Sequence, residues 1–467
     1  MSDVVARLVE ALGERVRTDE AARAAHRRDT WVLGELAEMQ GGGGPLPLAV
    51  VEPATTAQVA EVLRICRAAR APVVTYGGGS GVCGAVRLGE GQVVLSTAGL
   101  RGLVDLDERD LVARFRSGTL GMEAERCVQE RGLTIGHWPQ SIDLASVGGL
   151  VATRSAGQYS TGYGNVEDIL LALEVVLPDG AVLRTRATPR AAAGPDLRQL
   201  FLGSEGTLGV ITEVAFSLRP LPEASRGQAF HFAGLAEGIE AIRRTLRAGW
   251  RPPVVRLYDT IESGRNFRER CPAGRAALLL LHEGPAALVE AQAREVAALC
   301  RAAGGEPGDA GLVDHWLAER NKVPGFRVFL EKGIVVDTIE VAATWQRVVP
   351  LYEGVRASLL EVPGMLSASA HSSHSYRSGT NLYFSFAVRP EDPARMAEAY
   401  RESWARVMEG TLAAGGGIAH HHGIGRVRRP WLARELGGTG LALLRAVKRA
   451  VDPEGLLNPG ALLPDGD

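Results

Sequence analysis

Residues 75–81, TYGGGSG, decide how the fold is interpreted, because they place three consecutive glycines directly after a predicted strand at residues 72–76. Glycine has no Cβ, so the backbone N–H groups of such a run can approach a pyrophosphate closely. The run therefore predicts a ligand-binding loop at the end of a strand. A mobile glycine loop is the other interpretation that this stretch allows on its own.

The segments on both sides of this loop alternate between strands and helices. Residues 49–52 predict a short buried strand, and residues 55–71 carry apolar side chains at helical spacing, with Thr55 or Thr56 as N-cap. Residues 170–177 and 182–185 flank Pro-Asp-Gly at 178–180, which predicts a hairpin. The sequence RPLP at residues 219–222 then ends this pattern, because proline breaks strands and stiffens linkers.

Length and glycine content divide the chain into four parts. A chain of 467 residues is too long for one ordinary core, so two domains are expected. We predict an α+β fold with an N-terminal helical segment at 1–48, a ligand-binding domain at 49–220 and a substrate or cap domain at 221–410. A C-terminal segment at 411–467 is expected to return to the ligand-binding domain.

Composition excludes several classes of protein. The net charge of −2 gives no electrostatic basis for binding nucleic acid. The five cysteines are scattered, without a C-x-x-C pair, which argues against a disulfide scaffold or a structural zinc site. The charged N-terminus is unlike a signal peptide, and no apolar run reaches the ~18 residues of a membrane span. With an Arg/Ala-rich composition, these features predict a cytoplasmic protein of a bacterium.

Three further segments follow the glycine loop in the sequence and extend it to an ordered set of motifs. PQSIDLASVGG at 139–149 is followed by TRSA at 153–156, and SEGTLGVIT at 204–212 places two glycines at a turn entering a strand. A Rossmann fingerprint does not fit, because the glycines do not open a helix with an acidic residue ~20 positions later. In order and spacing, these segments resemble the vanillyl-alcohol-oxidase/p-cresol-methylhydroxylase flavoprotein superfamily.

That resemblance implies a two-domain flavoprotein in which residues 49–220 bind FAD. Cys83 and His137 lie near the loops but in no attachment motif, so non-covalent FAD is expected. The residues expected to contact FAD are Tyr76, Gly77, Gly78, Gly79, Ser80, Gly81, His137, Pro139, Ser141, Ile142, Asp143, Ala145, Ser146, Gly148, Gly149, Thr153, Ser155, Ala156, Glu205, Gly206, Thr207, Gly209, Val210 and Ile211.

A triple histidine at residues 420–422, within HHHGIGR, is the most unusual feature of the C-terminal segment. Glycines on both sides predict an exposed, tightly curved loop, where imidazoles can exchange protons near neutral pH. Arg426, Arg428 and Arg429 follow it and could bind an anionic substrate group. A solvated turn and a solvated basic face are the plainer interpretations.

A second segment, YRSGTNLY at 376–383, is predicted as a turn entering a strand. It is similar to a segment of flavin-linked 2-hydroxy-acid dehydrogenases in which two histidines and a later glutamate bind a divalent metal. Tyr376, Tyr383 and His421 stand at the corresponding positions. Tyrosine is a poor neutral ligand and the carboxylate is missing, so we predict no metal site.

The chain also resembles the alkyldihydroxyacetonephosphate (alkylglycerone-phosphate) synthases, from about residue 49 onward. GHWPQS (136–141), VVRLYD (254–259), NLYFSFA (381–387) and HHHGIGRVRRPWL (420–432) carry the likeness. The resemblance implies that the catalytic residues are Tyr383, His420, His421, His422 and Arg256, and that Arg320 binds substrate. Arg426 is a second expected substrate-binding residue.

The implied reaction exchanges the acyl group of acyl-dihydroxyacetone phosphate for a long-chain alcohol, without net redox. Tyr383 would move a proton from the carbon beside the ketone, which requires surroundings that favour its phenolate. Histidines would polarise the ketone and arginines would hold the phosphate.

Two other functions remain open. One is an FAD-dependent oxidase or dehydrogenase of a 2-hydroxy acid or alcohol, and the other is a flavin-carrying subunit or non-catalytic binding protein. The expected partners are a small-molecule or lipid substrate with an anionic head group and a second copy of the chain. Peripheral contact with a membrane is also expected, and nucleic acid is not.

Overall fold

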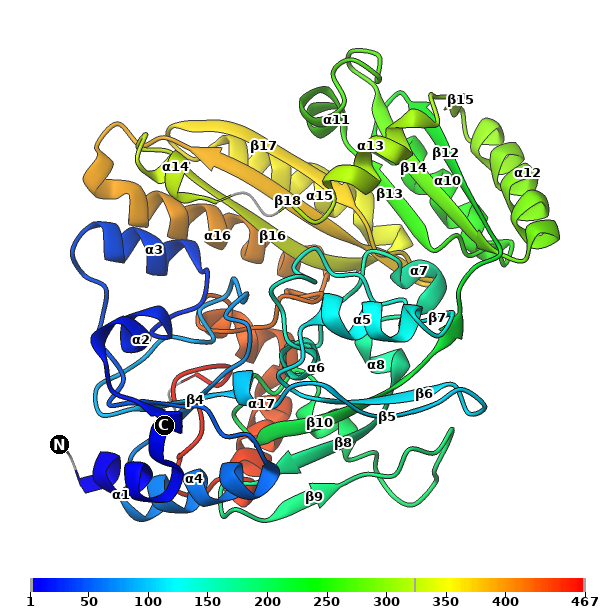
Figure 1. Ribbon diagram of the computed structural model, residues 1–467. Coiled ribbons are helices and arrows are strands. Elements are labelled where there is room, and N and C mark those ends of the chain that lie inside the picture. Colours follow the sequence, from blue (N-terminus) through cyan, green and yellow to red (C-terminus); the bar gives the residue numbers. More distant parts are fainter. Residues whose placement is uncertain (1–2, 323–324, 465–467) are drawn as a thin grey trace.

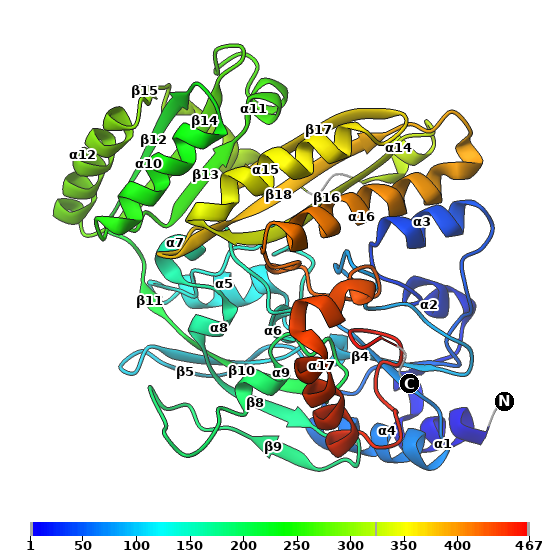
Figure 2. The same cartoon turned by 180° about the vertical axis from the view of Figure 1, so that it is seen from behind.

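The computed structural model describes residues 3–322 and 325–464 of the chain. An upper lobe lies across the top of a lower body, and α17 (Leu432–Val451) returns through the lower body (Figures 1 and 2). The described part of the N-terminal segment forms helices before the first parallel strands. They are α1 (Asp3–Leu12), α2 (Glu20–Ala25) and α3 (Val32–Met39).

The glycine loop follows strand β3, which lies at the edge of a small, largely parallel sheet of order β1-β2-β4-β3. The strands are β1 (Val16–Arg17), β2 (Val50–Val51), β3 (Val73–Tyr76) and β4 (Val93–Ser96). Helix α4 (Thr56–Ala68) follows β2, and the Thr55 hydroxyl caps it by accepting from the Gln58 N–H, as predicted. Five buried apolar side chains of α4, Val59, Val62, Leu63, Ile65 and Cys66, pack into the core beneath this sheet.

A five-stranded antiparallel sheet of order β5-β6-β10-β8-β9 completes the lower body. Its strands are β5 (Leu103–Asp107), β6 (Val112–Arg116), β8 (Leu170–Val176), β9 (Val182–Arg184) and β10 (Val210–Ser217). The predicted hairpin is present, since β8 and β9 pair on either side of Pro178-Asp179-Gly180. Short helices connect these strands: α5 (Gly121–Gln129), α6 (Val147–Thr153), α7 (Ser160–Tyr163), α8 (Val166–Ile169) and α9 (Arg198–Phe201).

The predicted boundary at residues 219–222 falls where β11 (Arg219–Pro220) pairs with β7 (Leu133–Thr134). Beyond it, the upper lobe is a seven-stranded antiparallel sheet of order β15-β12-β14-β13-β17-β18-β16. Its strands are β12 (Ala224–Phe232), β13 (Val254–Tyr258), β14 (Ala276–Gly284), β15 (Glu306–Pro307), β16 (Val335–Thr344), β17 (Met365–Ser372) and β18 (Gly379–Val388).

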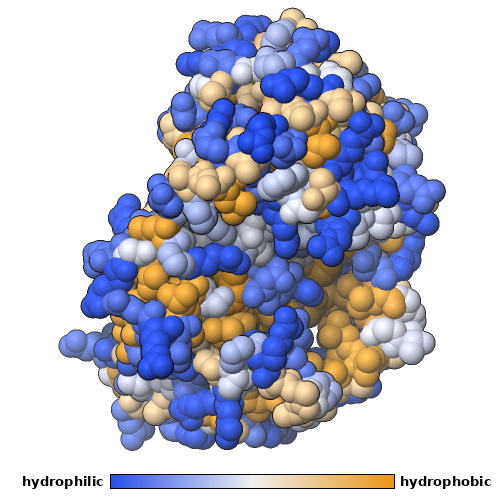
Figure 3. All heavy atoms as spheres, turned by 90° about the vertical axis from the view of Figure 1, so that its right-hand side faces the viewer, coloured by the Kyte–Doolittle hydropathy of each residue, from blue (hydrophilic) through white to orange (hydrophobic). Residues whose placement is uncertain are grey.

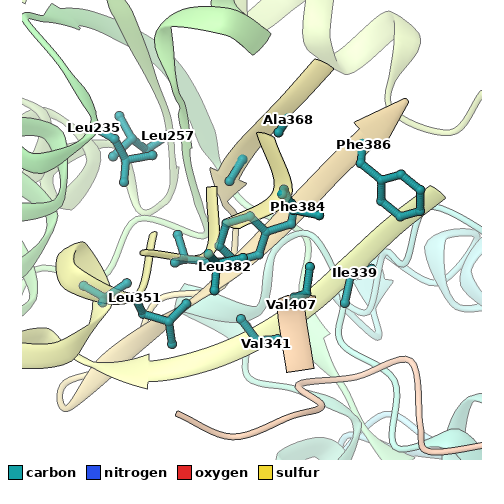
Figure 4. Close-up of a cluster of buried hydrophobic side chains, with 14 of the residues drawn as sticks. Leu235, Leu257, Ile339, Val341, Leu351, Ala368, Leu382, Phe384, Phe386 and Val407 are labelled. Carbon is teal, nitrogen blue, oxygen red and sulfur yellow. The ribbon is translucent and has the colours of Figure 1, made fainter. Parts of the chain in front are cut away.

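Helices cover the outer face of this sheet, as seen in Figure 2. They are α10 (Leu235–Arg247), α12 (Ala286–Ala302), α15 (Trp345–Leu360) and α16 (Met396–Ala413). Two short helices, α11 (Thr260–Asn266) and α13 (Gly311–Glu319), lie on the opposite face, where Leu312 and Val313 pack with Leu279 of β14. The short helix α14 (Arg327–Leu330) precedes β16. Successive side chains of β18 alternate between faces. Leu382, Phe384 and Phe386 join the buried apolar cluster in Figure 4, so Tyr383 on the opposite face is free for the site.

Hydrophilic side chains cover much of the face shown in Figure 3, with apolar patches gathered in its lower half. Among the described residues, no helix combines the length and apolar character that crossing a membrane requires.

Candidate active site

The triple-histidine loop is held by a buried ion pair beneath it. The guanidinium of Arg428 lies 2.8 Å from the carboxylate of Glu340 on β16, and both side chains are fully buried. The Glu340 carboxylate accepts hydrogen bonds from the backbone N–H groups of His420 and His422. Arg428 also donates to the carbonyls of Ile418 and Gly423, each at 2.8 Å. The loop is therefore fixed from below rather than being a solvated turn.

These contacts overturn the prediction that Arg428 binds an anionic substrate. Its guanidinium donates hydrogen bonds to main-chain carbonyls, to the Glu340 carboxylate and to the sulfur of Cys83. Arg426 donates to the carbonyls of Gly460, Arg87 and Pro459, which ties the loop to the chain end. This arrangement gives Arg426 a structural role and does not support its predicted contact with substrate.

Two phenol–imidazole pairs lie on the face of the loop that meets β18. The Tyr383 hydroxyl is 2.9 Å from His422 Nε2, and the Tyr376 hydroxyl is 2.7 Å from His420 Nε2. His420 and His421 are joined through their Nδ1 atoms at 2.8 Å. The sequence thus identified a set of residues that the fold brings together.

Burial keeps these pairs neutral. It lowers the pKa of His420 and of His421 to about 3, and it lowers the pKa of His422 well below its ordinary value. Burial also raises the pKa of Tyr383, and the carboxylate of Glu340 acts in the same direction. The expectation of surroundings that favour a phenolate is therefore wrong. Tyr383 is a protonated phenol at rest, hydrogen-bonded to a neutral His422.

Two arginines form a cationic region beside these pairs. Arg256 on β13 is buried and donates to the Tyr258 hydroxyl at 2.9 Å. The guanidinium groups of Arg256 and Arg320 lie 5.3 and 5.9 Å from the ring centroid of Trp316. Within the described residues neither guanidinium pairs with a carboxylate. Unpaired buried cations are costly unless an anion joins them, so this region fits an anionic substrate group.

Sequence reasoning gave no role to the residues that support this region. His371 and His374 come from β17 and the turn after it, and Glu262 comes from α11. The His371 ring stacks on Tyr383 at 4.8 Å, and its Nδ1 is 2.8 Å from the Glu262 carboxylate. A carboxylate within a strand rich in β-branched residues, such as Glu340 in VVDTIEVAAT, is the signal that could have identified this class of residue.

A cluster of three imidazoles also bears on the prediction of no metal. Ligand atoms of His374, His420 and His421 all lie within 4.8 Å of one another. Their spacing is close to what one divalent cation needs. Of the three positions compared with metal ligands in the sequence, His421 belongs to this cluster, and the Tyr376 hydroxyl lies 2.7 Å from His420 Nε2.

The predicted cofactor loops are packed against one another at the top of the lower body. A Cβ on Gly78 would lie 1.8 Å from the carbonyl oxygen of Leu144, and one on Gly77 would lie 2.6 Å from Ser146 Oγ. Gly79 has a φ of +67°, which favours glycine. Only glycine fits at Gly78, so residues 75–81 and 139–149 form one surface.

Unpaired polar atoms line the same region. His137 accepts or donates one hydrogen bond at 2.8 Å, between its Nε2 and Ser155 Oγ, while its buried Nδ1 has no partner. Thr75 Oγ1 and Ser117 Oγ are also buried without partners. Buried polar groups are normally satisfied, so these atoms fit a polar ligand such as FAD lying in the cradle.

Several predicted contacts have other roles. The side chains of Ile142, Val210 and Ile211 are buried in the hydrophobic interior, and Asp143 is exposed. The Glu205 carboxylate accepts from the N–H groups of Ile424 and Gly425, at 2.6 and 2.9 Å. It therefore joins the cofactor loop to the triple-histidine loop.

Comparisons with known proteins agree with this cradle. Residues 47–186 match the family model described as FAD binding domain, and residues 221–462 match that of FAD linked oxidases, C-terminal domain. The chain belongs to the FAD-linked oxidases. It is an enzyme of that family, and its cofactor is FAD.

Two relatives match most of the length of this chain. An uncharacterized FAD-linked oxidoreductase of Escherichia coli (strain K12), YgcU, is 34% identical over 435 residues, which is 90% of each chain. An alkyldihydroxyacetonephosphate synthase of Caenorhabditis elegans is 26% identical, over 90% of this chain and 76% of the relative.

Solved structures confirm the predicted two-domain fold. An alkyldihydroxyacetonephosphate synthase superposes with a TM-score of 0.81 at 23% identity, covering 97% of this chain and 84% of the other. For p-cresol methylhydroxylase the TM-score is 0.77 at 19% identity, covering 98% and 95%. The chain thus shares the two-domain fold of these two structures.

Proposed function

We propose that this FAD-linked enzyme exchanges the acyl group of acyl-dihydroxyacetone phosphate for a long-chain alcohol, with no net redox. The observation that carries the proposal is the unpaired cationic region of Arg256 and Arg320, set beside neutral phenol–imidazole pairs. It combines a site for an anionic head group with groups that can move a proton.

The arginines bind the phosphate in this proposal. Arg320 lies over Trp138 at 4.8 Å and over Tyr159 at 5.1 Å, and its Nε has no partner. Arg256 is oriented by Tyr258. Guanidinium groups bind phosphate oxygens through charge-assisted hydrogen bonds, so these two can fix the head group from two sides.

The neutral pairs move protons. The Tyr383 hydroxyl, held by its hydrogen bond to His422 Nε2 at 2.9 Å, gives its proton to the leaving carboxylate and regains a proton from the attacking alcohol. When bound, FAD supplies an N5 atom that can bond to carbon as a nucleophile. The likeness of HHHGIGRVRRPWL and NLYFSFA to the synthases supports this assignment.

A second candidate is an FAD-linked oxidase or dehydrogenase of a 2-hydroxy acid or alcohol. The imidazole cluster of His374, His420 and His421 favours it, because a divalent cation there could bind the carboxylate and hydroxyl of such a substrate. The printed description of the Escherichia coli relative is consistent with it.

The synthase proposal includes three further features: a homodimer, non-covalent FAD and a cytoplasmic enzyme that touches the membrane surface to reach its lipid. Cys83 supports the non-covalent cofactor, because its thiol is buried against Arg428 and burial raises its pKa. Light scattering, acid precipitation of released FAD and flotation with vesicles test these features separately.

One experiment tests the function. The purified yellow protein is incubated with acyl-dihydroxyacetone phosphate and hexadecanol, and lipids are analysed by mass spectrometry. The proposal predicts an alkyl ether and a released fatty acid. Anaerobic bleaching of the flavin by 2-hydroxy acids, without any ether, would identify the second candidate instead.

A further inference from the structure

We propose that His371 and Glu262 form a carboxylate–imidazole dyad, with His371 Nε2 as the general base that takes the proton from substrate. The proposal rests on the function proposed above and replaces Tyr383 as the base. It assigns a catalytic role to a histidine for which the sequence pattern gave none.

The dyad begins with a buried carboxylate that is fully paired. Glu262 Oε2 accepts from His371 Nδ1 at 2.8 Å. Its Oε1 accepts from Ser385 Oγ at 2.7 Å, Ser369 Oγ at 3.3 Å and the Arg265 guanidinium at 3.2 Å. Burial alone would raise the pKa of Glu262, but His371 and these donors hold it at about 2. These donors favour the ionised form of Glu262.

The tautomer of His371 follows from its two partners. Arginine donates hydrogen bonds and cannot accept them. The Arg256 guanidinium lies 3.1 Å from His371 Nε2, so this nitrogen carries a lone pair. Glu262, which is ionised, accepts from Nδ1, so Nδ1 carries the proton. Both neighbours thus prepare Nε2 to act as a base and leave Glu262 to stabilise the imidazolium.

The ring is held in this orientation by aromatic neighbours. Tyr383 stacks on one side with centroids 4.8 Å apart and planes 16° apart, and the Tyr258 centroid is 5.2 Å away. Of the ten histidines, all of which lie in the described part of the chain, His371 alone has a carboxylate within hydrogen-bond distance of a ring nitrogen. For His422 the carboxylate of Glu340 is more distant, at 3.7 Å from Nδ1.

Arg256 couples substrate binding to the base. When its guanidinium turns to an anionic group shared with Arg320, it withdraws its donor from His371 Nε2. The freed lone pair then faces the rest of the substrate. The C–H bond beside the ketone breaks, its electron pair stays on the substrate as an enolate, and the proton forms the Nε2–H bond. Glu262 accepts from Nδ1–H throughout.

His371→Ala tests the base directly, because it leaves a ring-sized space between Tyr258 and Tyr383. It is expected to keep its FAD and to lose about 10²–10⁴-fold in turnover. Added imidazole should restore a measurable part of that loss. His315→Ala, at an exposed histidine of the same domain, is the matched control. It should keep wild-type turnover, and added imidazole should not change that turnover. A wild-type rate in His371→Ala, or a loss that imidazole does not restore, would overturn the proposal.

Glu262→Gln gives a readout that a purely structural role would not move. The carboxylate raises the pKa of His371 against the lowering effect of burial, so its loss should shift the acid limb of the pH–rate profile to lower pH. The other charged or titratable groups near the ring are Arg256, Tyr258, Arg265, Tyr383, His374 and His421. An unchanged acid limb would argue against the dyad.

Failure of the proposed function can be told apart from failure of the dyad. If wild-type protein makes no ether but its flavin is bleached by a hydroxy acid, the same variants are compared in that reaction. If it does neither, ¹⁵N NMR of the imidazole decides, with protonated Nδ1 and unprotonated Nε2 expected for His371 in the FAD-bound protein. A proton on Nε2 would overturn the dyad in any case.

Discussion

Removal of the buried guanidinium in Arg428→Met should unfix the triple-histidine loop. The substitution deletes donors to Ile418, Gly423 and Glu340 and leaves the Glu340 carboxylate buried without its cation. Breaking one partner of a buried pair costs about 3–5 kcal/mol. At roughly 2–4 °C per kcal/mol for a domain of 150–250 residues, the melting midpoint should fall by about 6–20 °C.

Arg434→Met is the matched control. Arg434 pairs with Glu409 at 2.7 Å, but both side chains are about half exposed, at 52% each. An exposed pair contributes about 0–1 kcal/mol, so this variant should melt within about 4 °C of wild type. Both midpoints are measured by differential scanning fluorimetry of the FAD-bound protein, together with turnover. If Arg428→Met melts and turns over like Arg434→Met, the loop is not held by this ion pair.

Three further predictions follow from the site. Tyr383→Phe should stay yellow, because Tyr383 lies outside the cofactor loops, and its turnover should fall by about 10²–10⁴-fold. A wild-type rate would exclude Tyr383 from proton transfer. Gly78→Ala should purify without FAD, because its Cβ would overlap the Leu144 carbonyl. The ratio of flavin absorbance to protein absorbance measures the FAD content. A full complement of FAD would refute the packing of the loops. The folded protein holds the pKa of His420 and of His421 at about 3, against an ordinary value of 6.5. Between these two pH values the unfolded chain therefore binds more protons than the folded protein. The free energy of unfolding falls as the pH drops through that window. Melting midpoints between pH 7 and 5 should therefore drop less steeply in His420→Asn/His421→Asn, and equal slopes would show that these imidazoles are not buried as neutral groups.

Local sequence was sufficient for much of the fold. The glycine run after β3, the turn before β9 and the N-cap of α4 each depend on residues close in the chain, and each lies where it was predicted. The residues of the candidate site were also recognisable, because Tyr383 and the three histidines stand within short characteristic segments.

The roles that failed depend on contacts between distant residues. Arg428 looked like a surface cation, but the fold pairs it with Glu340, which lies 88 residues earlier. The phenolate expected at Tyr383 is excluded by burial that only the assembled strands β16 and β18 create. Likewise Glu262 and His371 are 109 residues apart, and no local pattern predicts that they meet.

The stoichiometry of one reaction mixture distinguishes acyl–alkyl exchange from oxidation. Wild-type protein is given acyl-dihydroxyacetone phosphate, hexadecanol and an artificial electron acceptor, and ether, fatty acid and reduced acceptor are quantified together. An acyl–alkyl exchange gives equal amounts of ether and fatty acid with no acceptor reduced. Reduction of the acceptor in proportion to substrate consumed, with no ether formed, would contradict it.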